Sequence, residues 1–183
     1  LVMTAGCAGR CDEPLRRVCV LTSGPFVASM TLDEAHHLLY VTHHMAGMPE
    51  VTGATRIVVY DTQPLKPLRS IYVAIPGPPV TVADPLSHRL FLGTSTDRQL
   101  HAADSGTGAL LQSVELPFAT GFLSVSRTSH VLYVRQPDSV MLFDTRTLAH
   151  LGTISAGTAL FAHALLEDEW LERLFGVTSR NRL

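Results

Sequence analysis

The sequence predicts an all-β fold, a β-propeller of about four blades that each hold four antiparallel strands. Three observations predict it. A unit of roughly forty residues recurs along the chain, each unit contains short alternating apolar runs, and turn-forming residues separate these runs. Alternating runs of about five residues are typical of half-buried antiparallel strands. A single blade exposes two apolar faces, so neighbouring blades must cover it.

The first repeated motif is a β-rich run, a polar turn, and a Leu–aromatic pair followed by an aliphatic residue. It occurs at four places, and its aromatic residues are spaced by 51, 42 and 42 positions. We expect this motif to supply the first two strands, a and b, of successive blades. The aromatic residues are Tyr40, Phe91, Tyr133 and Phe175.

The second motif lies between these pairs and ends in Asp followed by a turn residue. Its Asp residues, Asp61, Asp104 and Asp144, are 43 and 40 positions apart. An Asp carboxylate at a strand end accepts hydrogen bonds from backbone N–H groups of the following turn. We therefore predict a structural role for all three, rather than a catalytic or metal-binding one. The motif supplies strand c, and the apolar run after the turn supplies strand d.

The propeller is expected to fill residues 15–183. A strand d at Arg17–Leu21 precedes the first whole unit, so the chain begins inside one blade and ends inside another. This predicts an incomplete or partial ring. A defective four-bladed closure, a fragment of a longer propeller and a ring completed by a second copy remain open, and we favour the fragment. The predicted units are about 27–75, 80–116, 122–154 and a partial unit at 162–178.

Residues 1–14 are predicted to lie outside the blades, as an ordinary apolar or disordered terminus or as the remnant of a secretory signal. An ordinary terminus is favoured because no charged segment precedes it. The cysteines Cys7, Cys11 and Cys19 match no zinc spacing. One disulfide with a leftover thiol and three reduced thiols both remain open.

Composition excludes several classes of protein. Apolar residues make up 46% of the chain and charged residues 16%, which is too apolar for a disordered chain. The net charge is −2 and no Lys/Arg cluster stands out, so nucleic acid is not an expected partner. No apolar run reaches the length of a membrane-spanning helix, so no transmembrane helix is expected.

The chain resembles bacterial YVTN-type propeller repeats at Leu39-Tyr-Val-Thr42 and Val59-Tyr-Asp-Thr62. The second unit is similar to a quinoprotein-type repeat at Leu90-Phe-Leu-Gly-Thr94 and Ala103–Leu116, although Gln112 stands where that repeat has its docking Trp. This departure weakens any implied quinone, and no cofactor is predicted. The resemblance covers about residues 15–183 and implies a WD40/YVTN-like repeat fold, which is found in sensors, surface proteins, lactonases and dehydrogenase subunits and does not by itself indicate one of these functions. It favours an extracellular or periplasmic location.

One loop departs from the repeat, between strands b and c of the first unit. It runs over residues 43–56 and accounts for the spacing of 51 in place of 42. Extra length on a shared rim is where functional residues tend to lie, so we predict a ligand or partner contact here. The side chains suit soft metals, but a solvated loop is favoured and no metal site is predicted. The candidates are His43, His44, Met45, Met48, Glu50 and Arg56.

Other histidines have a simpler interpretation. His88 and His130 recur at the turn between strands a and b, at the place of His36 or His37, and this repetition indicates turn structure. His36/His37 and His43/His44 stand at opposite ends of one predicted strand, about 20 Å apart at roughly 3.3 Å per residue. One metal ion cannot join the two pairs.

The predicted function is a non-enzymatic binding module, with a protein, a small ligand or a second copy as partner. The alternative is an enzyme that uses the central channel, of the lactonase-like or quinoprotein-dehydrogenase type. It would need charged residues at the ends of the strands a, where the chain offers Asp33, Asp84, Arg127 and Glu167 or Asp168. No Gly-x-Ser-x-Gly motif is present and no catalytic residue is assigned. Binding is therefore favoured.

Overall fold

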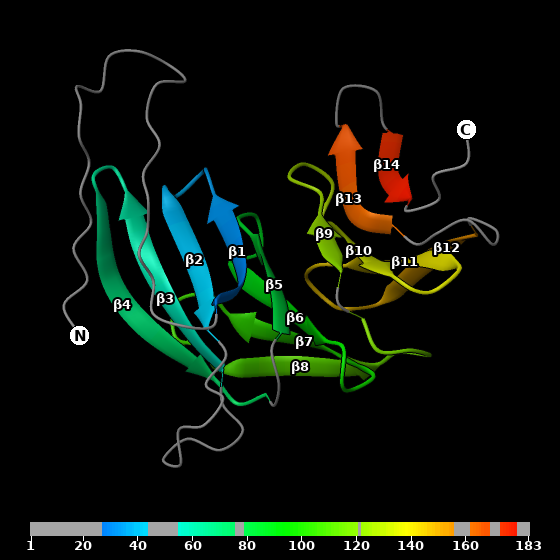
Figure 1. Cartoon of the computed structure of the whole chain (residues 1–183), viewed down its shortest axis with the longest axis horizontal. Coiled ribbons are helices and arrows are strands. Elements are labelled where there is room, and N and C mark those ends of the chain that lie inside the picture. Colours follow the sequence, from blue (N-terminus) through cyan, green and yellow to red (C-terminus); the bar gives the residue numbers. More distant parts are fainter. Residues whose placement is uncertain are drawn as a thin grey trace.

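The computed structural model describes residues 27–43, 55–75, 79–120, 122–155, 162–168 and 173–178. These residues form antiparallel sheets, three with four strands and one with two (Figure 1). The predicted all-β class is confirmed for this part of the chain, where no helix occurs. Accordingly, none of the described elements is a helix that could cross a membrane.

Each four-stranded sheet is a meander in which consecutive strands pair. The first consists of β1 (Val27–Asp33), β2 (Leu38–His43), β3 (Thr55–Thr62) and β4 (Leu65–Val73). The second consists of β5 (Pro79–Asp84), β6 (Arg89–Thr94), β7 (Gln99–Asp104) and β8 (Leu110–Glu115). The third consists of β9 (Leu123–Val125), β10 (Val131–Arg135), β11 (Ser139–Asp144) and β12 (His150–Ser155). The last pair is β13 (Ala162–Asp168) and β14 (Arg173–Thr178).

The sheets follow one another in an arc with their first strands innermost. β1 contacts β5, β5 contacts β9, and β9 contacts β13. The last strands β4, β8 and β12 lie on the periphery (Figure 1). This is the stacking expected of propeller blades, in which the first strand of every sheet faces the centre.

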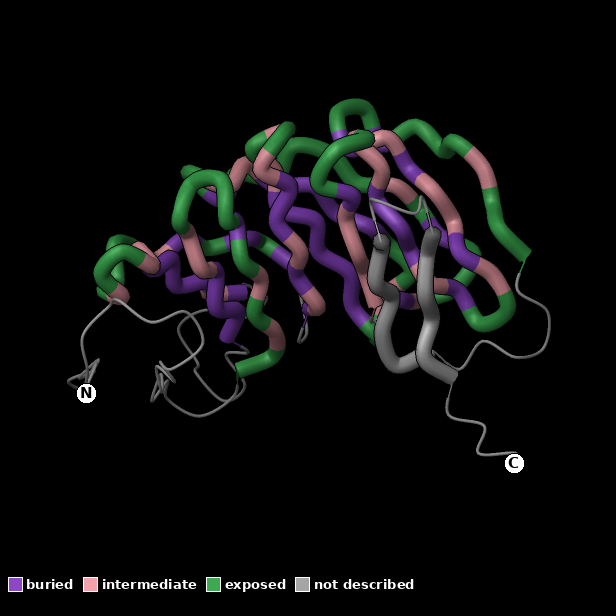
Figure 2. The backbone as a smooth tube through the Cα atoms, turned by 90° about the horizontal axis from the view of Figure 1, so that it is seen from above, coloured by how far each residue is buried: buried purple, intermediate pink, exposed green. Residues whose placement is uncertain are grey.

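The core lies between the sheets, and the strand-b aromatic residues build it. Tyr40 of β2 packs with Leu90 and Leu92 of the second sheet. Phe91, which alternation turns to the opposite face of β6, packs with Leu132 and Val134 of the third sheet. The first two blades thus place their aromatic residues against the next blade. Figure 2 shows the buried residues running through the middle of the sheets. Burial of such a side chain stabilises the fold by about 1.5–3 kcal/mol.

Hydroxyl groups join the inner strands of the first two sheets. The Ser29 Oγ accepts a hydrogen bond from the Thr81 N–H at 3.0 Å, and the Thr31 Oγ1 accepts one from the Ala83 N–H at 3.1 Å. The Thr42 hydroxyl donates to the Thr81 Oγ1 at 3.0 Å. The edge of β5 that does not pair with β6 has no ladder partner, so these side chains satisfy backbone groups that burial would otherwise leave unpaired.

The turn roles predicted for the three Asp residues are confirmed. The Asp104 Oδ1 accepts from the N–H groups of Gly106 at 3.1 Å and Thr107 at 2.7 Å, and also from the Thr107 hydroxyl at 2.8 Å. Asp144 accepts from the two N–H groups at the corresponding places of its own turn. Asp61 accepts from the Gln63 N–H at 2.8 Å.

The recurring histidines occupy a left-handed backbone position. His37, His88 and His130 have φ angles of 56°, 54° and 55° at the turn between the first two strands of their sheets. It is therefore His37, and not His36, that corresponds to the other two. His is among the side chains that visit this conformation more readily than most, which gives the repetition a structural cause.

Candidate functional site

The predicted contact loop is described only at its two ends. His44, Met45, Met48 and Glu50 lie outside the described residues. His43 is the last residue of β2 and pairs directly with Arg56 of β3. Both strands therefore extend further than the sequence predicted, and the loop between them is shorter at each end.

His43 is buried rather than solvated, with 6% of its surface exposed. Its Nε2 has no hydrogen-bond partner among the described residues. Burial lowers the pKa of His43, and the positive charge of Arg56 lowers it further. Arg56 in turn donates from Nε and Nη2 to the Ser70 Oγ at 3.2 and 3.0 Å. The two residues therefore contribute to the packing of the first sheet, and no metal-ligand cluster occurs among the described residues.

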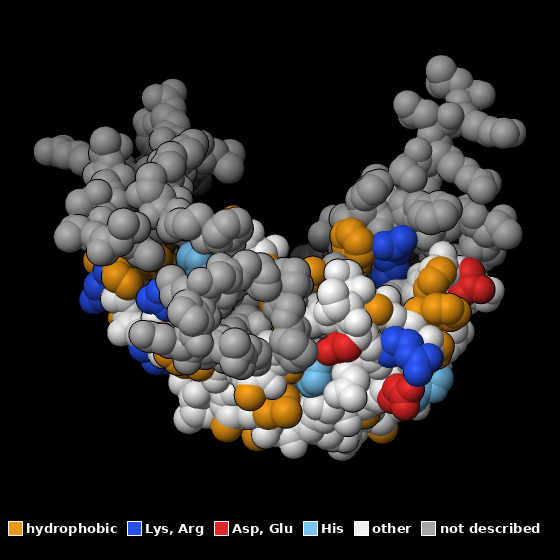
Figure 3. All heavy atoms as spheres, turned by 60° about the horizontal axis from the view of Figure 1, so that its bottom comes forward, with side chains coloured by type: hydrophobic (Ala, Val, Ile, Leu, Met, Phe, Trp, Pro, Cys, Tyr) orange, Lys and Arg blue, Asp and Glu red, His pale blue; other side chains and the backbone are white. Residues whose placement is uncertain are grey.

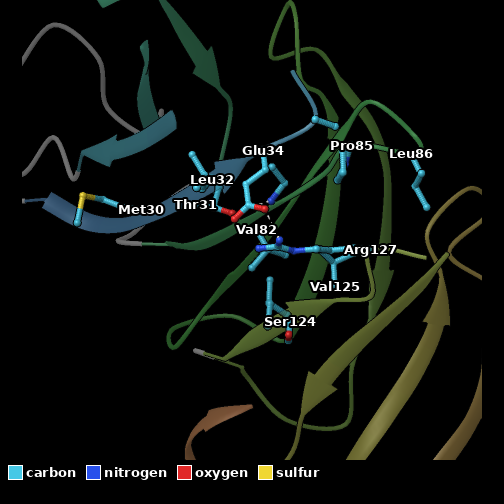
Figure 4. A pocket seen from close by; sticks show the side chains of 13 residues that line it. Met30, Thr31, Leu32, Glu34, Val82, Pro85, Leu86, Ser124, Val125 and Arg127 are labelled. Atoms are coloured by element: carbon cyan, nitrogen blue, oxygen red, sulfur yellow. Dashed lines mark hydrogen bonds and ion pairs between the residues drawn. The ribbon is translucent and has the colours of Figure 1, made fainter. Parts of the chain in front are cut away.

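A cavity of about 510 Å³ lies on the inner side of the arc, and we call it the inner hollow (Figure 4). It is bounded by β1, β5 and β9 and by the turns that follow these strands. These turns are at the opposite end of the blades from His43, which pairs with the start of β1. The apolar side chains of its wall are Met30, Leu32, Val82, Leu86, Leu123 and Val125.

The alternation of β1 explains the apolar wall. Ser29 and Thr31 point to β5 and make the hydroxyl contacts, so Met30 and Leu32 point away from that contact. Both are largely solvent-accessible, with 61% of Met30 and 44% of Leu32 exposed. Leu86, in the turn after β5, is also 44% exposed. Large apolar side chains thus gather on a concave surface.

Two charged side chains meet in the inner hollow. The Arg127 Nη1 donates to the Glu34 Oε2 at 2.6 Å, across 93 positions of sequence. Glu34 belongs to the turn after β1 and Arg127 to the turn after β9, so the pair connects the first and third sheets and passes over the second (Figure 4). Both side chains are more than half exposed, at 58% and 55%.

Asp33 and Asp84, two of the acids that the sequence offered for the central channel, do not line the inner hollow. Asp33 is buried and accepts hydrogen bonds from the backbone N–H of His36 and from its ring. Asp84 is buried and accepts from the Leu86 N–H and the Ser87 hydroxyl. Turn geometry therefore uses both carboxylates. Arg127 does line the inner hollow, whereas the side chains of Glu167 and Asp168 lie outside the described part.

No protein-family model matches the chain, and neither does any curated protein. Among solved structures, the chain is similar to Kuenenia stuttgartiensis hydrazine synthase, with a TM-score of 0.63 and 13% identity. The match covers 91% of this chain and 44% of that chain, so this chain spans less than half of its length. The fold is a β-propeller. In all, 560 solved chains match, and a fold found in so many proteins does not by itself indicate a function.

Away from the inner hollow, the propeller also brings together Ser113, His101 and Asp97. The Ser113 Oγ lies 2.8 Å from the His101 Nδ1, because the two residues are direct partners across β7 and β8. The Asp97 Oδ2 lies 3.7 Å from the His101 Nε2, which exceeds hydrogen-bond distance. Sequence spacing did not indicate this group, since strand register creates it. These three residues do not line the inner hollow. They also do not line a second, smaller cavity of about 150 Å³ beside Phe118 and Met141.

The described surface carries mixed charges. On the face of the propeller seen in Figure 3, Lys and Arg side chains lie beside Asp and Glu. Arg98, for example, donates to the Glu115 carboxylate at 2.9 Å. The described residues of this face therefore form no basic patch of the kind that attracts phosphate backbones.

Proposed function

We propose that the chain is a non-enzymatic propeller binding module that holds a small, mainly apolar ligand in the inner hollow. One observation carries this proposal, which is the exposure of Met30 and Leu32 on a concave wall. The volume of about 510 Å³ falls within the range of small-molecule sites, roughly 300–1,000 Å³. Such sites are mainly apolar with a few polar groups, and the inner hollow has this composition.

Burial of the apolar wall supplies the free energy of binding. Each Å² of apolar surface removed from water contributes about 25 cal/mol, and a ligand in a concavity removes more surface than one on a flat face. Exposed leucines also occur on the periphery, such as Leu111 of β8. Single apolar side chains of this kind are normal on protein surfaces and indicate no site by themselves.

The loop over residues 43–56 remains a separate prediction. It belongs to the opposite end of the blades from Glu34 and Arg127. We propose it as a second contact surface, for a protein partner or a second copy of the chain. The extra length of this loop in the repeat is what supports that role.

The neutral fluorophore N-phenyl-1-naphthylamine tests the proposal, because its emission rises in apolar surroundings. We expect it to bind the full chain, and we expect Leu32→Ser to weaken its binding about tenfold through lost apolar contact. Leu111→Ser is the matched control, since Leu111 is 49% exposed but lies outside the inner hollow. Equal binding by both variants, or no binding by the parent, would rule the proposal out.

A further inference from the structure

We infer that the inner hollow selects amphipathic cations, with the Glu34 carboxylate as anchor for the ligand's ammonium group and Arg127 as the internal cation that the ligand displaces. This inference rests on the proposed binding function and adds the charge of the ligand to it. The ligand class is an alkyl- or arylammonium compound with one cationic end.

Arg127 shows where a cation is stabilised in the inner hollow. Its side chain reaches across the cavity from the third sheet, and its guanidinium meets the Glu34 carboxylate at 2.6 Å (Figure 4). The same wall supplies the apolar contacts of Met30, Leu32 and Val82. A ligand whose ammonium takes the place of the guanidinium therefore brings its apolar body against these side chains.

Release of Arg127 from Glu34 costs little free energy, because much of the Coulomb attraction of an exposed pair is offset by the entropy of holding two long side chains together. Ion pairs between exposed side chains stabilise a protein by only about 0–1 kcal/mol, and both members of this pair are more than half exposed. The long stem of Arg127 allows its charged group to return to water. Contact between the apolar body of the ligand and the apolar wall then supplies the favourable free energy of binding, because the guanidinium of Arg127 makes no comparable apolar contact.

The charges around the inner hollow favour a cation over an anion. Among the described residues that line it, Glu34 and Arg127 are the charged ones. At the ends of β1 and β5, which line the inner hollow, lie the buried carboxylates of Asp33, adjacent to Glu34, and of Asp84. His36 faces Asp33, and the ring centroid of His88 lies 5.0 Å from that of His36.

An anion that displaced Glu34 from Arg127 would enter the field of these carboxylates. A cation that displaced Arg127 from Glu34 would be attracted by the same carboxylates, since like charges repel and opposite charges attract through the intervening low-dielectric wall. Charge complementarity therefore selects the cation.

The test compares three ligands with one chain length, dodecylammonium, dodecanol and dodecanoate, by their displacement of N-phenyl-1-naphthylamine from the full chain. We expect dodecylammonium to displace the fluorophore at about a fivefold lower concentration than dodecanol, as one exposed ion pair implies. Dodecanoate should be the weakest of the three. A parent protein that prefers dodecanoate overturns the inference.

Two variants assign the preference to the ion pair. Glu34→Gln should abolish the advantage of dodecylammonium over dodecanol, whereas Arg127→Gln should increase it severalfold by removing the tethered competitor. Glu115→Gln is the matched control, because Glu115 forms an exposed pair with Arg98 outside the inner hollow. It should leave all three ligands unchanged.

The outcomes separate the two proposals. Normal binding of the neutral fluorophore and of dodecanol, without a preference for dodecylammonium, would refute the cation inference and leave the binding function intact. An Arg127→Gln variant that binds dodecylammonium more weakly than the parent would also refute the inference. Failure of the neutral fluorophore to bind the parent protein would refute both.

Discussion

At the scale of single residues, the place of a side chain in its blade decides its chemistry. His37 and His43 stand at the two ends of the same hairpin, yet the first is exposed in a left-handed turn and the second is buried at the end of β2. A buried imidazole favours its neutral form, because removal from water penalises the charged form. His43 is therefore expected to link folding to pH.

His43 should make the protein less stable at mildly acidic pH. Burial lowers its pKa in the folded chain, and Arg56 lowers it further, whereas the unfolded chain protonates this residue near the ordinary value of about 6.5. The contribution of neutral His43 to the free energy of unfolding is therefore fully present above about pH 6.5. It is lost as the pH falls below about 6.5 toward the lowered pKa of the folded state. His43→Gln should reduce this fall, measured by urea denaturation at about pH 7.5 and 5.5.

The control for this pH effect is His150→Gln, since His150 is exposed on β12. It should retain the fall of the parent protein. Asp104 does not interfere, because the Thr107 hydroxyl and the Thr107 N–H lower the pKa of its carboxyl. Its contribution is therefore lost only below an ordinary value that is already near 4. An unchanged fall in His43→Gln would contradict the role of His43.

At the scale of elements, the turns between the third and fourth strands depend on one carboxylate each. Asp104→Ala removes the acceptor for Gly106 and Thr107, and we expect the free energy of unfolding to fall by about 1–2 kcal/mol. Asp104→Asn retains one carbonyl oxygen as acceptor and should lose less than half of that. Urea denaturation of the two variants measures the difference. Comparable losses for Ala and Asn would show that the turn does not depend on these hydrogen bonds.

Strands and turns could be predicted from the sequence because their causes are local. Alternation placed Tyr40 and Phe91 in strand centres, and the Asp–turn motif placed Asp104 in a turn. The inner hollow could not be predicted in this way, since Glu34 and Arg127 meet only after three sheets have stacked. Asp33 was expected in the channel, but neighbouring N–H groups of its own turn compete for its carboxylate. The pairing of Ser113 with His101 likewise requires strand register, which spacing along the chain does not contain.

At the scale of the whole molecule, the contact between the second and third sheets depends on a residue without a side chain. A Cβ added at Gly93 would lie 2.7 Å from the Thr120 Cγ2 and 3.2 Å from the Thr120 carbonyl oxygen. Thr120 cannot easily move, because its hydroxyl donates to the carbonyl groups of Phe122 and Arg135. We expect Gly93→Ala to lower the free energy of unfolding by about 1–3 kcal/mol, measured by chemical denaturation.

Gly152→Ala is the matched control for this contact. A Cβ at Gly152 would meet nothing within 4 Å, so this variant should be neutral or stabilise the protein by up to about 1 kcal/mol. The double variant Gly93→Ala/Thr120→Ser should recover part of the loss, because Ser lacks the methyl group that meets the new Cβ. Equal effects of the two Gly→Ala changes would show that the sheets have room to adjust.

The Glu34–Arg127 pair is the chord of the arc that the first three sheets describe. It joins the turn after β1 to the turn after β9, which belong to the first and third sheets. When an arc flattens, its chord must lengthen before any of its segments deforms. A small rotation between neighbouring blades is therefore summed over two sheet-to-sheet contacts and parts these two side chains first. The distance between the turns after β1 and β9 therefore measures the curvature of the arc. It changes when neighbouring blades rotate, even if the geometry within each sheet stays the same.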